Sequence, residues 1–190
     1  MVTGKIALSG IYENILGPGK RLVIWLQGCD RGCTGCQSTH FVNFLPFEDI
    51  QSKIDSLFEE AVQAECSGIT ISGGEPFAQS NVIDYIVSLI EAHNERYNNK
   101  IDILVYTGYT YEELLPKYQI LLKQIDVLID GPFLYSLNDG KGLRGSSNQR
   151  MLFLTDNKEK LKPMYEKMSA TRNQVIDFVD GRFVLVGLKK

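Results

Sequence analysis

The sequence has no excess of positive charge and no long hydrophobic run. Its 20 Lys and Arg residues are outnumbered by 23 Asp and Glu residues, which gives a formal net charge of −3. A broad basic surface for a nucleic-acid backbone is therefore not expected. No apolar run reaches the roughly 18 residues of a membrane-spanning helix, and the first 20 residues lack the pattern of a secretion signal. We expect a cytoplasmic protein that binds neither nucleic acid nor membranes.

Cysteine is also scarce, because only four of the 190 residues are cysteine. Thiols stay reduced in the cytoplasm, so a disulfide framework is not expected. Three of the four nevertheless lie within eight residues, as Cys29, Cys33 and Cys36 in the segment LQGCDRGCTGCQSTH (26–40). Clustered thiols in a reducing compartment indicate metal binding or redox chemistry.

The C-x3-C-x2-C spacing leaves two kinds of metal site open. A structural zinc site needs four ligands, and His40 or Cys66 is available as the fourth. An iron–sulfur cluster that only carries electrons also needs four. With three thiolates, one iron stays open to a substrate or cofactor, so we interpret the missing fourth cysteine as a functional feature. Cys66, which is distant in sequence, is expected to be a buried structural residue.

Alternating patterns predict an α/β fold. Short segments rich in Ile, Val and Leu, each ending at glycine, indicate buried parallel strands at 21–28, 68–74, 101–108 and 125–131. Helical patterns separate them at 47–65, 80–97 and 110–124, the last interrupted near Pro116. In such folds, the loops at the carboxyl ends of the strands carry the ligand sites.

The remainder of the chain is less regular. Residues 137–150 are polar and glycine-rich, which indicates a loop, and 172–190 predict a β-hairpin that turns at Asp180-Gly181. We expect one domain over residues 1–190. Its parts are an N-terminal segment (1–20), a core (21–152) and a C-terminal extension (153–190).

A second glycine-rich motif, SGGEP, follows the second predicted strand as Ser72, Gly73, Gly74, Glu75 and Pro76. The two glycines remove side chains where a ligand would press against the backbone. The proline stiffens the turn, and the glutamate adds a carboxylate. Taken alone, the motif equally fits an ordinary turn between a strand and a helix.

The two motifs together, in this order after the first two strands, resemble the radical S-adenosylmethionine (SAM) superfamily. LGPGKR (16–21), ahead of the first strand, resembles enzymes that activate glycyl-radical proteins. Four further features resemble the activating proteins of anaerobic ribonucleoside-triphosphate reductase. They are the glycine before the last cysteine, YTGYTYEEL (106–114), VLIDGPF (127–133) and RGSSNQR (144–150). The resemblance runs from about residue 12 to residue 152 and leaves the extension uncovered.

This resemblance implies a partial, open (β/α)6-like barrel that carries the β-hairpin-like tail. A complete eight-fold barrel takes about 200 residues or more, and this chain has room for five or six strand–helix units. The open side would admit a large substrate such as a loop of another protein.

The resemblance also implies the cofactors. Cys29, Cys33 and Cys36 would bind one [4Fe–4S] cluster, and SAM would chelate its open iron. One electron would then split SAM into methionine and a 5′-deoxyadenosyl radical. The SGGEP turn would hold the methionine amino group through backbone carbonyls and Glu75. The further implied SAM contacts are Thr107, Gly108, Asp130, Arg144, Ser146 and Asn148, with Ser147 and Gln149 in the same loop.

Alternatives stay open for two of these assignments. Asp130 equally fits an aspartate that caps a helix or braces a loop, and residues 144–149 equally fit a solvated loop.

The implied function is that of an activase, which takes a hydrogen atom from a backbone glycine of a partner enzyme. The partner would be anaerobic ribonucleotide reductase, and a low-potential donor such as flavodoxin or ferredoxin would supply the electron. Two alternatives remain. One is a radical SAM enzyme that acts on a different peptide or small molecule. The other is a non-catalytic iron–sulfur or zinc protein that binds a partner.

Overall fold

A computed structural model describes residues 1–179 and 181–189. Its centre is a six-stranded sheet in the order β2-β3-β5-β6-β7-β8. The bounds are Ile6–Glu13 (β2), Lys20–Leu26 (β3), Gly68–Gly73 (β5), Asp102–Tyr106 (β6), Val127–Asp130 (β7) and Arg150–Phe153 (β8). The four inner strands run parallel, and the two edge strands run antiparallel to their neighbours. The predicted α/β class is confirmed, with a mostly parallel central sheet.

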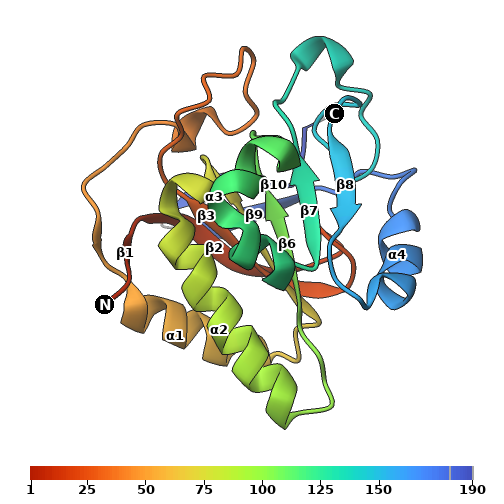
Figure 1. The fold of residues 1–190 in the computed structure, drawn as a ribbon. Helices are drawn as coiled ribbons and strands as arrows, with labels where there is room; N and C mark the ends of the chain where they lie inside the picture. The colour runs from red at the N-terminus through yellow and green to blue at the C-terminus, as the bar shows by residue number, and fades with distance from the viewer. Residues whose placement is uncertain (180, 190) are drawn as a thin grey trace.

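Three helices connect the parallel strands and lie together on one face of the sheet (Figure 1). They are α1 (Gln51–Gln63), α2 (Ser80–Arg96) and α3 (Tyr111–Gln124). A capping box between Thr110 and Glu113 begins α3, and the backbone leaves helical geometry at Tyr118, two residues after Pro116. Every strand and helix predicted between residues 21 and 131 is therefore present.

Several further elements, inside and outside this region, were not predicted. They are β2, β8, α4 (Lys158–Glu166), the short pair β1 (Thr3–Gly4) and β4 (Glu48–Asp49), and the 3-10 turns η1 (Thr39–Phe41), η2 (Pro76–Gln79) and η3 (Tyr135–Leu137). Strand β2 lies in the N-terminal segment (1–20), which we predicted as separate from the core. It nevertheless forms one edge of the central sheet. Within the described residues, three strand–helix units build the sheet, fewer than the five or six expected, because antiparallel strands occupy both edges.

The C-terminal extension covers the opposite face of the sheet. Its strands β9 (Val175–Val179) and β10 (Arg182–Val186) form the predicted antiparallel hairpin. Gly181 has a φ of 77°, as its turn position requires, and Asp180 lies outside the described residues. Tyr165, Met168 and Val186 pack with Val23, Trp25 and Leu104 in a second core. The division into three segments of one domain stays a prediction.

A buried ion pair within the sheet accepts a hydrogen bond from the extension. The Arg21 guanidinium, 0% exposed, donates to both Asp102 carboxylate oxygens at 2.8 and 3.0 Å and to Thr70 Oγ1 at 2.8 Å. The Tyr165 hydroxyl of α4 donates to Asp102 Oδ1 at 2.6 Å. The carboxylate of Asp102 is therefore shared between β3 and the extension.

No helix within the described residues combines the length and apolar content needed to cross a bilayer.

Candidate metal and cofactor site

The loop that follows β3 carries the three clustered cysteines, and hydrogen bonds close it at its base. The Gly28 N–H donates to the Phe41 carbonyl at 2.8 Å. Within the loop, Gly32 and Gly35 adopt φ values of 61° and 72°. This left-handed backbone favours glycine and allows the chain to turn tightly between the cysteines.

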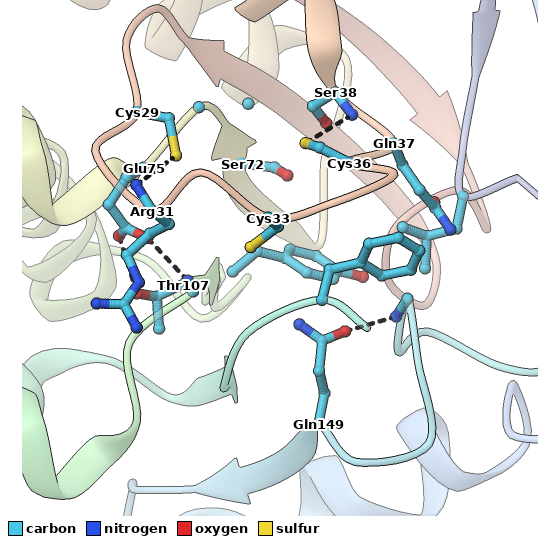
Figure 2. Close-up of a pocket in the computed structure, with 17 residues that line it drawn as sticks. Cys29, Arg31, Cys33, Cys36, Gln37, Ser38, Ser72, Glu75, Thr107 and Gln149 are labelled. Carbon is cyan, nitrogen blue, oxygen red and sulfur yellow. Dashed lines mark hydrogen bonds between the residues drawn. The ribbon is translucent and has the colours of Figure 1, made fainter. Parts of the chain in front are cut away.

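The side chains of Cys29, Cys33 and Cys36 line one pocket, and all three are free and partly exposed (Figure 2). Cys29 Sγ accepts a hydrogen bond from the Arg31 N–H at 3.4 Å, and Cys36 Sγ accepts one from the Ser38 N–H at 3.3 Å. Burial raises the pKa of Cys29 above its ordinary value, while the Arg31 N–H acts in the opposite direction. Donors of this kind stabilise the thiolate, which is the form that binds metal.

The donor set fits an iron–sulfur cluster. In the described part of the chain, no three His, Cys, Asp or Glu side chains converge closely enough to hold a single metal ion. The cysteine ligands of a four-iron cluster bind separate irons and need not converge on one atom. Cys66 is fully buried in the core beside the helices and does not line the pocket. His40 lines a neighbouring cavity instead.

The SGGEP turn lies directly against the cysteine loop. The Glu75 N–H donates to the Gly28 carbonyl at 2.8 Å. A Cβ added at Gly74 would lie 2.1 Å from that carbonyl oxygen and 2.7 Å from the Phe41 carbonyl oxygen. A Cβ at Gly73 would lie 2.4 Å from the backbone N and O of Leu26. The glycines therefore make room for neighbouring backbone, including that of the loop that carries the thiols.

We expect Gly74→Ala to destabilise the protein by about 1–3 kcal/mol, in the range of other overpacked sites. The new methyl group would meet backbone atoms of the cysteine loop, which cannot rotate away. Gly108→Ala is the control, because its nearest atom is Cγ of the Arg31 side chain at 2.9 Å. Urea unfolding of both variants measures the difference, and equal losses would contradict this account.

Glu75 bridges the carboxyl ends of β5 and β6. Its Oε1 accepts from the Thr107 hydroxyl at 2.8 Å and the Phe77 N–H at 3.0 Å, and its Oε2 accepts from the Gly108 N–H at 2.8 Å. The residue is 1% exposed. Burial raises the pKa of Glu75 to about 7, with a smaller contribution from Asp30, against the three hydrogen bonds that lower it. A cation bound beside this carboxylate would favour its ionised form.

This pKa predicts the pH dependence of the metal-free protein. In the folded chain Glu75 keeps its proton up to about pH 7, whereas its ordinary value is 4.5. The folded state then binds more protons between these values, so the free energy of unfolding falls as the pH rises through this window. Glu75→Gln should flatten this part of the profile, by at most about 1.4 kcal/mol per pH unit. Urea unfolding between pH 5 and 8 measures both slopes, and parallel profiles would refute the assignment.

The sequence-predicted contacts separate into two groups. Ser72, Gly73, Gly74, Glu75, Thr107 and Gly108 line the pocket with the thiols, and Pro76, Asp130, Arg144, Ser146 and Asn148 do not. Asp130 is buried and bound to other groups. Its Oδ1 accepts from Arg150 Nε at 3.0 Å, its Oδ2 accepts from the Tyr111 N–H at 2.7 Å, and it forms an ion pair with Arg150.

Arg144, Ser146 and Asn148 hold the shape of the loop between η3 and β8. Arg144 Nη1 donates to the Gln149 carbonyl at 3.2 Å, and Asn148 donates to the Pro132 carbonyl at 2.8 Å. The Ser146 hydroxyl accepts from the Leu134 N–H at 3.1 Å. The loop residues that line the pocket are Gly145 and Gln149, and Figure 2 shows Gln149 across from the thiols.

The sequence did not predict the contact between Arg31 and Tyr109, which joins the cysteine loop to the turn between β6 and α3. The Arg31 guanidinium lies 4.2 Å from the Tyr109 ring centroid, and the Tyr109 hydroxyl donates to Asp30 at 2.7 Å. Arg31 also lies 3.7 Å from the Glu113 carboxylate. Tyr109 lies within the string YTGYTYEEL, but no local pattern indicates its distant partner.

A family model described as a 4Fe-4S single cluster domain matches residues 15–152. The anaerobic ribonucleoside-triphosphate reductase-activating protein of Enterobacteria phage T4 is 34% identical over 143 residues, which cover 74% of this chain and 88% of the relative. The protein of that name from Escherichia coli (strain K12) is 37% identical over 139 residues, covering 70% and 88%. The chain belongs to this family of activating proteins.

A more distant relative has a different printed name. The pyruvate formate-lyase-activating enzyme of Streptococcus mutans is 25% identical over 157 residues, which cover 80% of this chain and 59% of the relative. The family model names a single cluster, in agreement with one group of three pocket cysteines. Its match ends at residue 152, so the C-terminal extension lies beyond the family region.

Proposed function

We propose that the protein is a radical SAM activase that generates a glycyl radical on an anaerobic ribonucleoside-triphosphate reductase. The observation that carries this proposal is the meeting of two motifs in one pocket. Three thiols separated as C-x3-C-x2-C face the same space as the SGGEP strand end, in a chain that belongs to the reductase-activating family. This combination favours the activase over a partner-binding zinc or iron–sulfur protein, which needs no carboxylate-bearing strand end in the pocket of its metal.

In this proposal, Cys29, Cys33 and Cys36 hold three irons of a [4Fe–4S] cluster and leave the fourth to SAM. When bound, the cluster would supply the one electron needed to cleave SAM into methionine and a 5′-deoxyadenosyl radical, which is the chemistry that takes a hydrogen atom from a glycine of the partner. The backbone N–H groups of Arg31 and Ser38 stabilise two of the thiolates.

The strand ends around Glu75 bind and orient the amino acid part of SAM. The carboxylate faces the pocket and carries the charge that suits a cationic amino group. Thr107 and Gly108 hold the Glu75 side chain in place from the next strand. Pro76 begins the 3-10 turn that follows it. Hydrogen-atom abstraction needs correct positioning and no general base, which agrees with this division of roles.

The loop between η3 and β8 contributes the opposite wall. We assign Asp130, Arg144, Ser146 and Asn148 to positioning, because their contacts hold the loop that places Gln149 and Gly145 in the pocket. The central sheet would be this chain's form of the partial, open (β/α)6-like barrel, with antiparallel strands at both edges. A low-potential donor such as flavodoxin or ferredoxin, in the cytoplasm, would supply the electron.

Anaerobic reconstitution with iron and sulfide tests the proposal. We expect about four irons per chain, a number set by the cluster type, and formation of 5′-deoxyadenosine when SAM and a reductant are added. With a reductase from the same organism, an electron paramagnetic resonance signal of a glycyl radical should appear on the partner. One zinc per chain without SAM cleavage would overturn the proposal, and SAM cleavage without a radical on the reductase would indicate another substrate.

A further inference from the structure

We propose that the C-terminal strap, residues Gly187–Lys189, forms one wall of the thiol pocket and positions Cys36. The strap follows β10 and belongs to the extension that lies outside the matched family region. The proposal rests on the proposed function in one respect, because it takes this pocket as the site of the cluster. The proposal gives the C-terminal extension a role in the site. Neither the cysteine motif nor the SGGEP motif indicates a role for that part of the chain.

The first support is a reciprocal pair of hydrogen bonds between the strap and the cysteine loop. Gln37 Oε1 accepts from the Lys189 N–H at 3.1 Å, and Gln37 Nε2 donates to the Lys189 carbonyl at 3.4 Å. The side-chain amide thus pairs with the strap as a neighbouring strand would. Gln37 directly follows Cys36, and the Ser38 N–H on its other side donates to Cys36 Sγ. Fixing Gln37 therefore fixes the backbone that carries the third thiol.

The second support is that the strap is itself anchored from several directions. Gln174 Nε2 donates to the Leu188 carbonyl at 2.8 Å. Asn138 Nδ2 donates to the Lys189 carbonyl at 3.4 Å, and Arg172 Nη1 donates to the same carbonyl. Such multiple anchoring makes the strap a fixed part of the site.

Arg172 extends this anchoring to the loop opposite the thiols. It is 7% exposed and also donates to the carbonyls of Lys141 and Arg144. One buried side chain of the extension therefore holds both the strap and the loop that carries Gly145 and Gln149.

The third support is the position of Leu188. Its side chain lines the thiol pocket together with the three cysteines. It also borders a larger cavity of about 720 Å³ between the hairpin and the sheet, lined by apolar side chains such as Trp25 and Phe41. Leu188 thus lies at the boundary between the two spaces. An apolar group there limits access of water and dioxygen to a cluster, as the hydrophobic shell does in other metal sites.

Thiol reactivity in the metal-free protein tests the strap without any cluster. Wild type, Leu188→Ala and Gln37→Ala are treated with iodoacetamide, and the rate at each cysteine is followed by peptide mass spectrometry. We expect Cys36 to react several-fold faster in both variants. Cys66, fully buried in the core, should stay unreactive, which shows that the fold is intact. Ile176→Ala is the matched control, because this hairpin residue is 68% exposed and lies outside both cavities.

A second readout uses reconstituted protein. We expect the visible absorption of the cluster to bleach several-fold faster in air with Leu188→Ala, and Leu188→Met to restore the wild-type rate because it restores the volume of the wall. If the wild type binds no cluster, the proposed function fails, and Cys36 reactivity alone decides the strap. If the cluster forms but Cys36 reactivity and bleaching match wild type in every variant, the strap proposal is overturned.

Discussion

Alanine at Cys33 is expected to leave the protein without a stable iron–sulfur cluster and without SAM cleavage. The variant keeps only two of the three thiols that line the pocket, and two thiolates leave two irons of a four-iron cluster without a protein ligand. Iron content after anaerobic reconstitution should fall to background. The yield of 5′-deoxyadenosine should fall below detection, because no further cysteine lines the pocket within the described residues.

Cys66→Ala is the matched control for this experiment. Cys66 is fully buried in the core beside the helices and contributes no atom to the pocket. Its replacement should leave the iron content and the SAM cleavage rate of the wild type. Loss of the cluster in this variant would show that Cys66 is a fourth ligand, and full cleavage activity in Cys33→Ala would show that the ligand assignment is wrong.

The largest loss of stability is expected from Asp102→Ala. The substitution leaves the fully buried Arg21 guanidinium without its ion-pair partner and removes the acceptor of the Tyr165 hydroxyl. Breaking one partner of a buried pair costs about 3–5 kcal/mol, because an uncompensated charge stays in the interior. Urea unfolding measures the loss. We also expect the extension to become more sensitive to limited proteolysis, because α4 loses its polar link to the sheet.

Two further variants provide a control for this loss and isolate one of its contributions. Glu166→Ala removes an exposed pair with Lys162, 3.8 Å long, and should cost no more than about 0.5 kcal/mol. Tyr165→Phe keeps the ion pair but removes the hydroxyl that binds Asp102, and should cost about 1 kcal/mol. A loss below 1 kcal/mol for Asp102→Ala would refute the view that Asp102 stabilises the buried Arg21 charge and links α4 to the sheet.

Some of the residues implied as SAM contacts do not line the pocket, because their side chains hold the loop beside it. Asp130 and Arg144 carry no local signal that separates a ligand-binding role from a supporting one. Asp130 equally fits an aspartate that caps a helix or braces a loop, and Arg144 equally fits a solvated loop. Whether such a side chain reaches the pocket depends on partners distant in sequence, here Arg150 for Asp130 and Gln149 for Arg144. Only the folded chain distinguishes the two roles.

The sequence by itself determined the alternation of strands and helices from residue 21 to 131 and the two motifs at the strand ends. These features are local, since helix and strand periodicity, glycine positions and cysteine spacing are all read within short windows. Parallel strands bring their carboxyl ends to one edge, so the meeting of Cys33 and Glu75 in one pocket also followed.

The tertiary structure alone decided the edges of the sheet and the C-terminal wall of the pocket. Strands β2 and β8 are partly exposed along most of their length. Ser9 and Gly10 interrupt the apolar residues of β2, and β8 has only four residues. The pairing of Gln37 with Lys189 joins residues 152 positions apart. No local pattern encodes such a contact, because it depends on how the extension packs against the whole sheet.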